Sequence, residues 1–211
     1  MLALPQEGID HSVLVDAASR LGVPVVTVMG DPNDLVRRYS LVASWFGAHV
    51  VVRIPGDNVC VCPREIDRII GFYFQHQPNW SWLVSNLDQN IGNNGYPGGL
   101  GAEVYSWKLL DYLNQNVTDP ELREHPHKSM FITERVKTLK CPELFGPELK
   151  FSVDTIEDLQ RTRDLYAALG TKFTGAEAVR FLKEQTNGLT DTDKIGKASI
   201  RTFRNTTGES E

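Results

Sequence analysis

Short apolar runs alternate with amphipathic segments along most of the chain. The clearest run, at 49–54, reads HVVVRI and is followed by Pro55-Gly56, which ends it. A β-branched run this short is typical of a strand that is buried on both faces of a parallel sheet. A second run lies at 23–29, and apolar residues at helical spacing separate the two. The pattern predicts a βαβ unit over 23–54, with parallel strands and a right-handed crossover.

Capping signals and apolar spacing predict the other elements. Asp31 is the expected N-cap of the helix inside the βαβ unit, with Pro32 at its first position. Pro126 is expected to bend or split the helical segment in which it lies. The remaining predicted elements are a strand end at 2–5, helices at 9–21, 63–74, 106–113, 119–135, 156–169 and 174–185, and strands at 82–86, 103–105 and 149–153.

Strands that alternate with helices predict an α/β fold, a three-layer sandwich around a mostly parallel sheet. No break in composition divides the chain, so residues 1–186 are expected to form one domain. From 187 to 211 the sequence is polar and aperiodic, which predicts a flexible tail.

Composition limits the classes of function. With 211 residues, 41% of them apolar, the chain can bury a sizeable core. A net charge of −5 without a basic stripe argues against a nucleic-acid partner. No apolar run could span a membrane, and the start MLALPQEGID has neither the basic nor the apolar region of a signal peptide. We therefore expect a cytoplasmic protein without a membrane partner.

The three cysteines are Cys60, Cys62 and Cys141, an odd number that suggests reduced thiols. Cys60-Val-Cys62 could form half of a metal site. A zinc site would need a second pair of ligands at matching spacing, which the sequence lacks.

Two aspartates follow predicted strands. Asp57 comes just after the strand at 49–54, and Asp154 follows the run at 149–153. Taken singly, each is more simply a turn or cap residue. In open α/β sheets, however, ligands bind at the carboxyl ends of strands. Mg²⁺ binds through one or two carboxylates, water and substrate phosphates, so the pair predicts a metal-phosphate site.

Several motifs in order give the chain a family resemblance. They are LGVPV, GDPNDLVRRY, GAHVVVRIPGDNVCVCP, VSN, YPGGLGAEVYS, REH and FSVDTIEDL. In this order the sequence resembles the spore-coat-polysaccharide cytidylyltransferase-like family, which is related to the CMP-Kdo and acylneuraminate cytidylyltransferases. The resemblance covers roughly Leu2 to Leu182 and implies the nucleotide-diphospho-sugar transferase fold.

The resemblance also implies a reaction. A sugar hydroxyl would attack the α-phosphate of CTP, giving a CMP-sugar for surface polysaccharide and releasing pyrophosphate. Asp57 and Asp154 match the family's catalytic Mg²⁺-binding aspartates. The other matching positions, which would line the nucleotide and sugar crevice, are Arg53, Gly56, Asn86, Tyr96, Pro97, Gly99, Leu100, Glu103, Glu124 and His125.

Three features depart from the family pattern. The family begins with a strand and a loop of the type QARMGSTRLPGK that grips the triphosphate, and nothing here corresponds to it. Gly98 and Gly101 stand where the pattern YPDGLDVEV has acids. The strand end reads DNV instead of DCP, with the cysteines displaced to 60 and 62. Loss of a central first strand is expected to cost both stability and nucleotide affinity.

Two alternatives stay open at this point. A glycosyltransferase that uses a nucleotide sugar would usually hold metal through D-x-D, which Asp57-Asn58-Val59 lacks. A catalytically impaired remnant, acting as a binding or dimerisation module, would explain the missing loop. By analogy with related proteins, we expect a homodimer formed through 103–135. The sequence does not identify the sugar.

Overall fold

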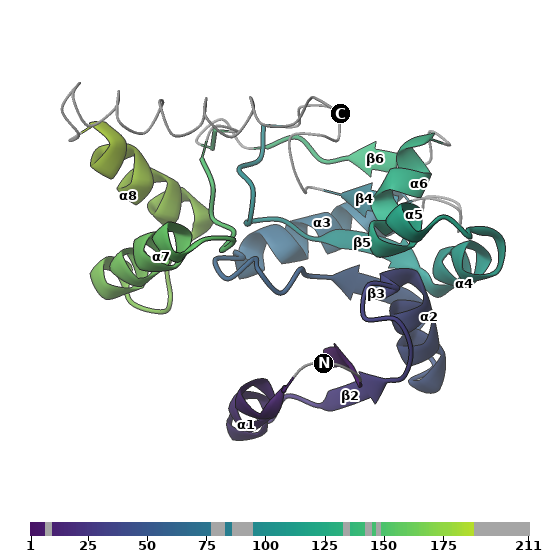
Figure 1. Cartoon of the computed structure of the whole chain (residues 1–211). Helices are drawn as coiled ribbons and strands as arrows, with labels where there is room; N and C mark the ends of the chain where they lie inside the picture. The colour runs from purple at the N-terminus through teal and green to yellow at the C-terminus, as the bar shows by residue number, and fades with distance from the viewer. Residues whose placement is uncertain are drawn as a thin grey trace, which may run out of the picture.

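The computed structural model describes residues 1–6, 10–76, 83–85, 95–132, 136–141, 145–146 and 149–187, and within these the strands form two sheets. The two-stranded sheet has the order β1-β2, and the four-stranded sheet has the order β3-β5-β4-β6 (Figure 1). The strands are β1 (Leu2–Pro5), β2 (Val25–Val28), β3 (Val50–Arg53), β4 (Leu83–Ser85), β5 (Glu103–Ser106) and β6 (Val136–Thr138).

The pairing of strands is mixed. β1 runs parallel to β2, and β4 runs parallel to β6. β5 runs antiparallel to both of its neighbours, β3 and β4. The α/β class predicted from the sequence is confirmed. The predicted βαβ unit is wrong, because β2 and β3 lie in different sheets and pair with other strands. An apolar run identifies a strand but not its partner, which is set by contacts distant in the chain.

The helices agree with most of the capping signals. They are α1 (Ser12–Arg20), α2 (Leu35–Trp45), α3 (Pro63–His76), α4 (Trp107–Asn116), α5 (Pro120–Glu124), α6 (Pro126–Ile132), α7 (Ile156–Leu169) and α8 (Gly175–Asn187). Ser106 caps α4 through its side chain, and Thr155 caps α7 in a capping box with Asp158. Pro126 splits the segment at 119–135 into α5 and α6, as predicted.

Two local predictions are wrong. The N-cap of α2 is Asp34, which accepts a hydrogen bond from the Arg37 N–H over 3.0 Å. Asp31 instead accepts the Asn33 N–H over 2.8 Å, a turn that delays the helix by three residues. Residues 149–153 form no strand; among them Lys150 makes a single parallel bridge with Gly98. The predicted tail at 187–211 lies outside the described residues except for Asn187, which ends α8.

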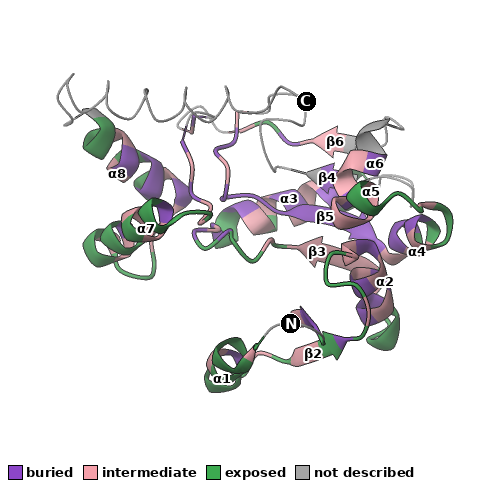
Figure 2. Ribbon diagram, viewed as in Figure 1, coloured by how far each residue is buried: buried purple, intermediate pink, exposed green. Residues whose placement is uncertain are grey.

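Among the described residues, buried apolar side chains form three clusters. One joins the 149–151 segment to α7 and α8, a second joins α2 to α4, and a third joins α3 to β4 and β5. Figure 2 shows β5 and the inner sides of these helices buried, while α1 is largely exposed. Two of these clusters therefore include side chains of the four-stranded sheet, and the other lies between the 149–151 segment and the last two helices.

A groove of about 750 Å³ separates the two sheets. It is lined by residues of β1, α2, β3 and the turn that follows β3 to Asp57. Figure 1 shows β1 and β2 standing apart from β3. β1 pairs on one edge with β2, and β3 pairs on one edge with β5, so each has a second edge without a strand partner in the described residues.

Candidate active site

The turn after β3 presents Asp57 to solvent. The Asn58 N–H donates to the Pro55 carbonyl over 3.1 Å, which closes the turn. The Asn58 side chain is buried, and its Nδ2 donates to the Gly101 carbonyl over 3.2 Å. The Asp57 carboxylate has no hydrogen bond or ion pair within the described part of the chain. The turn is thus anchored on one side while its acidic group remains available.

The structure brings Asp57 and Asp154 together from distant parts of the chain. The Val153 N–H donates a hydrogen bond to the Asp57 carbonyl oxygen over 3.0 Å. The residue directly before Asp154 is therefore bonded to the turn that carries Asp57. Both aspartates are exposed, so their carboxylates stand at the surface near this backbone contact.

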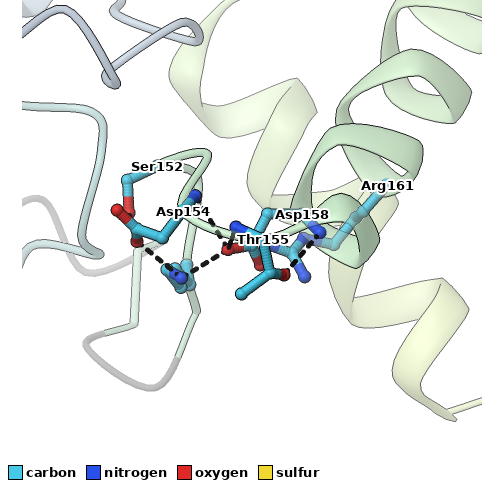
Figure 3. Close-up of polar contacts among 6 residues, drawn as sticks. Ser152, Asp154, Thr155, Asp158 and Arg161 are labelled. Atoms are coloured by element: carbon cyan, nitrogen blue, oxygen red, sulfur yellow. Dashed lines mark hydrogen bonds and ion pairs between the residues drawn. The ribbon is translucent and has the colours of Figure 1, made fainter.

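Asp154 belongs to a cluster of charges at the start of α7 (Figure 3). Its Oδ2 lies 2.7 Å from the Lys150 Nζ, and the Ser152 hydroxyl donates to it over 3.1 Å. Lys150 also reaches Asp158, whose second oxygen lies 2.6 Å from Arg161. Asp154 is half-exposed, with 52% of its side chain accessible.

Asp158 holds the loop before α7 in place. Its carboxylate accepts the backbone N–H groups of Asp154 and Thr155, each over 3.1 Å. Burial alone would raise the pKa of Asp158, but the hydrogen bonds from Lys150 and Arg161 outweigh burial and lower that pKa well below its usual range. Asp158 therefore stays ionised and keeps Asp154 at the end of the 149–153 segment.

The loop at 95–101 packs against the same segment. The Phe151 N–H donates to the Gly98 carbonyl over 2.6 Å. Gly99 has φ +93, and a Cβ there would lie 2.1 Å from the Ser152 nitrogen. Only glycine fits such a contact at this backbone conformation. The loop that resembles the family's sugar-side motif is thus fixed beside Asp154.

The four predicted site residues in that loop, Tyr96, Pro97, Gly99 and Leu100, are all buried. Tyr96 is fully buried and donates its hydroxyl hydrogen to Glu65, while Pro97 and Leu100 are buried as well. Their side chains therefore pack in the protein interior and do not face solvent. Gly56, by contrast, is exposed in the turn before Asp57.

Glu103 and Arg53 form a buried ion pair across β3 and β5. The Arg53 Nη1 lies 3.0 Å from Glu103 Oε2, and His127 Nδ1 lies 3.0 Å from Oε1. The Glu103 side chain is completely inaccessible. Burial raises its pKa, but Arg53 and His127 more than compensate, so the pKa lies below its ordinary value. For Arg53 the two effects have the opposite signs. Burial lowers its pKa, but Glu103 together with neighbouring groups raises it by more, so the pKa of Arg53 lies above its ordinary value.

Glu124 and His125 lie at the junction of α5 and α6. His125 is half-buried, and burial followed by the Lys128 charge lowers its pKa. Its ring lies 5.8 Å from that of His127, which connects the junction to Glu103. Glu124 lines a pocket of about 310 Å³ at the N-terminal end of α2. Asn86 lies outside the described residues.

Sequence reasoning missed several residues of this region. Asp158 could have been found, because Thr155-x-x-Asp158 is a capping-box spacing before a helical pattern. Lys150, Arg161 and His127 carry no such signal, since their partners are set by tertiary contacts.

The residues present fit a magnesium-phosphate site better than a metal site made by protein alone. No group of three or more His, Cys, Asp or Glu side chains with metal-binding geometry occurs among the described residues. Two carboxylates are enough for Mg²⁺ when phosphate oxygens and water complete its coordination. Cys60 and Cys62 are buried in the structure, and burial raises the pKa of Cys60 to about 11, which disfavours the thiolate that zinc requires.

The described helices include none with the length and apolar character that a bilayer crossing requires.

Comparison with known proteins confirms the resemblance that the motifs indicate. No family model matches the chain. The chain is similar to the spore coat polysaccharide biosynthesis protein SpsF of Bacillus subtilis, with 23% identity over 172 residues, which cover 77% of the chain and 66% of SpsF. It is also similar to the uncharacterized protein MJ1063 of Methanocaldococcus jannaschii, with 24% identity over 157 residues, covering 72% of the chain and 59% of MJ1063. The chain spans less than two thirds of the length of these relatives.

Solved structures show the same fold. A cytidylyltransferase from Leptospira borgpetersenii superposes with a TM-score of 0.74 and 21% identity, covering 89% of this chain and 78% of the other. A structure of CMP:2-keto-3-deoxy-manno-octonic acid synthetase complexed with CTP gives a TM-score of 0.56 and 14% identity, covering 75% of this chain and 78% of the other. The fold is that of the cytidylyltransferases, as the sequence predicted.

Proposed function

We propose that the chain is a Mg²⁺-dependent sugar cytidylyltransferase domain that forms a CMP-sugar and pyrophosphate for polysaccharide synthesis. The observation that supports this proposal is the hydrogen bond from Val153 to the Asp57 carbonyl, which joins the two segments that carry the exposed residues Asp57 and Asp154. The cytidylyltransferase fold and the similarity to SpsF support the same reaction class.

In the proposed reaction, a sugar hydroxyl oxygen bonds to the α-phosphorus of CTP, and the bond from that phosphorus to the pyrophosphate oxygen breaks. The hydroxyl proton leaves to solvent or to pyrophosphate. Asp57 and Asp154 would hold the metal, which when bound neutralises phosphate charge and orients the displacement. The turn after β3 and the capped start of α7 keep the two carboxylates in place, and such positioning supplies most of the catalysis in transfers of this kind.

The loop at 95–101 would form the sugar side of the site. Its backbone bonds to the segment that leads to Asp154, and Gly99 makes that contact possible. The buried Glu103 would act through Arg53 and His127, by fixing the strand from which the loop leaves, and would not touch the sugar itself.

A second candidate is a non-catalytic member of the same fold. The observation that favours it is the division of the strands into two sheets, with the groove of about 750 Å³ between β1 and β3. In the described residues, one edge of β1 and one edge of β3 have no strand partner, and both strands border the groove. Such a protein would bind nucleotide weakly or not at all.

One pair of measurements separates the candidates. Pyrophosphate release is measured with CTP, Mg²⁺ and a panel of acidic and amino sugars, and CTP binding is measured by calorimetry without sugar. Turnover that EDTA abolishes and excess Mg²⁺ restores supports the transferase. Nucleotide binding without turnover supports the impaired protein, and preference for UDP- or GDP-sugars over CTP would indicate a glycosyltransferase.

The predicted homodimer through 103–135 is part of the same proposal. α4 turns Leu109, Leu110 and Leu113 inward against α2, so its own apolar face is already covered. The dimer interface would therefore be formed by α5, α6 and the outer side of α4, where Tyr112 is exposed. Sedimentation of the wild-type chain and a Tyr112→Glu variant tests it; a monomer at all concentrations contradicts it.

A further inference from the structure

Lys150 holds an unusual position between two carboxylates. Its Nζ lies 2.7 Å from Asp154 Oδ2 and 2.5 Å from Asp158 Oδ2. The backbone at Lys150 is fixed, because it bridges to Gly98 and the next N–H donates to the Gly98 carbonyl. The side chain is 41% exposed on a flexible four-carbon stem. The ammonium can therefore move while its backbone stays in place.

Asp158 has further partners besides Lys150. Arg161 lies 2.6 Å from one of its oxygens, and the N–H groups of Asp154 and Thr155 donate to the other. Removal of the lysine would leave this carboxylate with a cation and two backbone donors. The capping box of α7 would remain intact as well, because the Thr155 hydroxyl accepts the Asp158 N–H independently.

Asp154 does depend on Lys150. Within the described residues its carboxylate has one other contact, the Ser152 hydroxyl at 3.1 Å. The lysine is thus the sole cation beside this exposed carboxylate in the described part of the chain. A divalent ion that approached the same oxygen would meet a positive charge already in place.

We propose that Lys150 is a displaceable internal counter-ion. Without ligand it neutralises Asp154, and when a divalent cation binds Asp154 the ammonium moves to the phosphate oxygens that accompany the metal. Lysine suits this role because it binds phosphate as a mobile point charge. The inference rests on the proposed function, since that function puts a metal and a polyphosphate at Asp154.

The first experiment titrates Mn²⁺ into the full chain without nucleotide, with bound and unbound ion followed by electron paramagnetic resonance. In Lys150→Gln the competing charge is gone, so Mn²⁺ should bind about three- to tenfold more tightly than in the wild type. Arg161→Gln is the matched control, because it removes a cation from Asp158 only, and it should change the affinity by less than about twofold. Equal or weaker Mn²⁺ binding in Lys150→Gln would overturn the inference.

The second experiment uses pyrophosphate as the probe at saturating Mn²⁺. Lys150→Gln should bind pyrophosphate about tenfold more weakly than the wild type, because a phosphate-binding charge is lost. Lys150→Arg keeps the charge and should lose less than about threefold. An unchanged pyrophosphate affinity in Lys150→Gln would show that the ammonium does not move to phosphate, and the inference fails.

A third variant separates this inference from the proposed function. Asp154→Asn should abolish Mn²⁺ binding if the metal binds there. If Asp154→Asn binds Mn²⁺ like the wild type, the metal site itself is wrong and the proposed function fails with it. If Asp154→Asn loses the metal but Lys150→Gln behaves like the wild type, only the role of Lys150 is wrong. Should Lys150→Gln not fold, Lys150→Met retains the apolar stem and is measured in its place.

Discussion

The hydrogen bond from the Val153 N–H to the Asp57 carbonyl, 3.0 Å long, joins two segments that are almost a hundred positions apart in the sequence. The same carbonyl also accepts the Val59 N–H within the turn after β3. The bond uses backbone atoms only, so substitution of either aspartate leaves it in place. The carboxylates of Asp57 and Asp154 can therefore be changed with little cost to the fold.

The first prediction concerns these two carboxylates. Asp57→Asn and Asp154→Asn should each lower pyrophosphate release from CTP by about 100-fold or more, because a metal ligand supplies several kcal/mol of charge stabilisation. Melting temperatures should stay within about 3 °C of the wild type, since both side chains are exposed. Asp164→Asn on the exposed surface of α7 is the control. Activity that survives in either site variant would contradict the two-carboxylate site.

The second prediction concerns Gly99. An alanine there places its Cβ 2.1 Å from the Ser152 nitrogen at φ +93, so the loop or the 149–153 segment must shift. We expect Gly99→Ala to lower the free energy of unfolding by about 2–4 kcal/mol. Gly98→Ala is a matched control, because its Cβ meets no atom within 4 Å, and it should cost less than about 1 kcal/mol. Urea unfolding of both variants measures the difference.

If Gly99→Ala remains folded, its activity should fall further than the loss of folded protein alone explains. The shift would move the segment that carries Asp154, and displacement by about 1 Å can cost about 100-fold in rate. A variant with full stability and full activity would show that the tight contact at Gly99 is unnecessary.

The third prediction concerns the buried carboxylate of Glu103. Glu103→Gln leaves Arg53 and His127 facing a neutral amide, and breaking a buried pair in this way should cost about 3–5 kcal/mol. The pKa of Glu103 is lowered in the folded protein. Its stabilisation is therefore fully present above the ordinary glutamate pKa of about 4.3 and is lost as the pH falls through the folded value.

The difference in melting temperature between the wild type and Glu103→Gln should consequently be largest near neutral pH. It should shrink as the pH falls below the ordinary glutamate pKa of about 4.3, because the unfolded chain then takes up protons that the folded Glu103 does not. Melting curves from pH 3 to pH 7 test this. A difference that grows as the pH falls would contradict the ion-pair assignment.

Sequence patterns predicted those features that depend on near neighbours. Ser106, Thr155 and Thr174 cap helices because each side chain bonds to a backbone N–H three residues on, and that relationship is visible in the sequence. Asp31 was mistaken for a cap because Asp34 offers the same chemistry one turn later. Local propensity cannot choose between two equivalent caps.

Long-range relationships were predictable only where a family pattern supplied them. A short β-branched run indicated β3 but could not show that β5, about fifty residues later, would pair with it antiparallel. The 149–153 run was expected to form a strand, yet only Lys150 bridges to a neighbour, because the loop at Gly98 and Gly99 occupies that side. The ion pairs of Lys150 and His127 depend wholly on such contacts.

The last prediction concerns the groove between β1 and β3. The resemblance implies a further strand and a glycine- and arginine-bearing loop ahead of the segment that is β1 here. Each of β1 and β3 presents one edge without a strand partner in the described residues, and the groove between them is lined largely by apolar side chains of α2 and β3. A strand fused ahead of Met1 by a linker should pair with these edges and join the two sheets.

A fusion with a segment of the QARMGSTRLPGK type should raise the melting temperature by about 4–8 °C, which corresponds to about 2 kcal/mol for a chain of this size. It should also tighten CTP binding at least about tenfold, because the loop's arginines supply phosphate contacts. Calorimetry and thermal melts of fused and unfused chains measure both effects.

Two control fusions separate the strand from the loop. Replacement of both arginines by glutamine should keep the gain in stability and lose the gain in CTP affinity. Proline placed in the middle of the strand removes a ladder hydrogen bond and should abolish both gains. If the fused chain neither melts higher nor binds CTP more tightly, the groove is not a strand site, and the separation of the two sheets is a property of this protein's own fold.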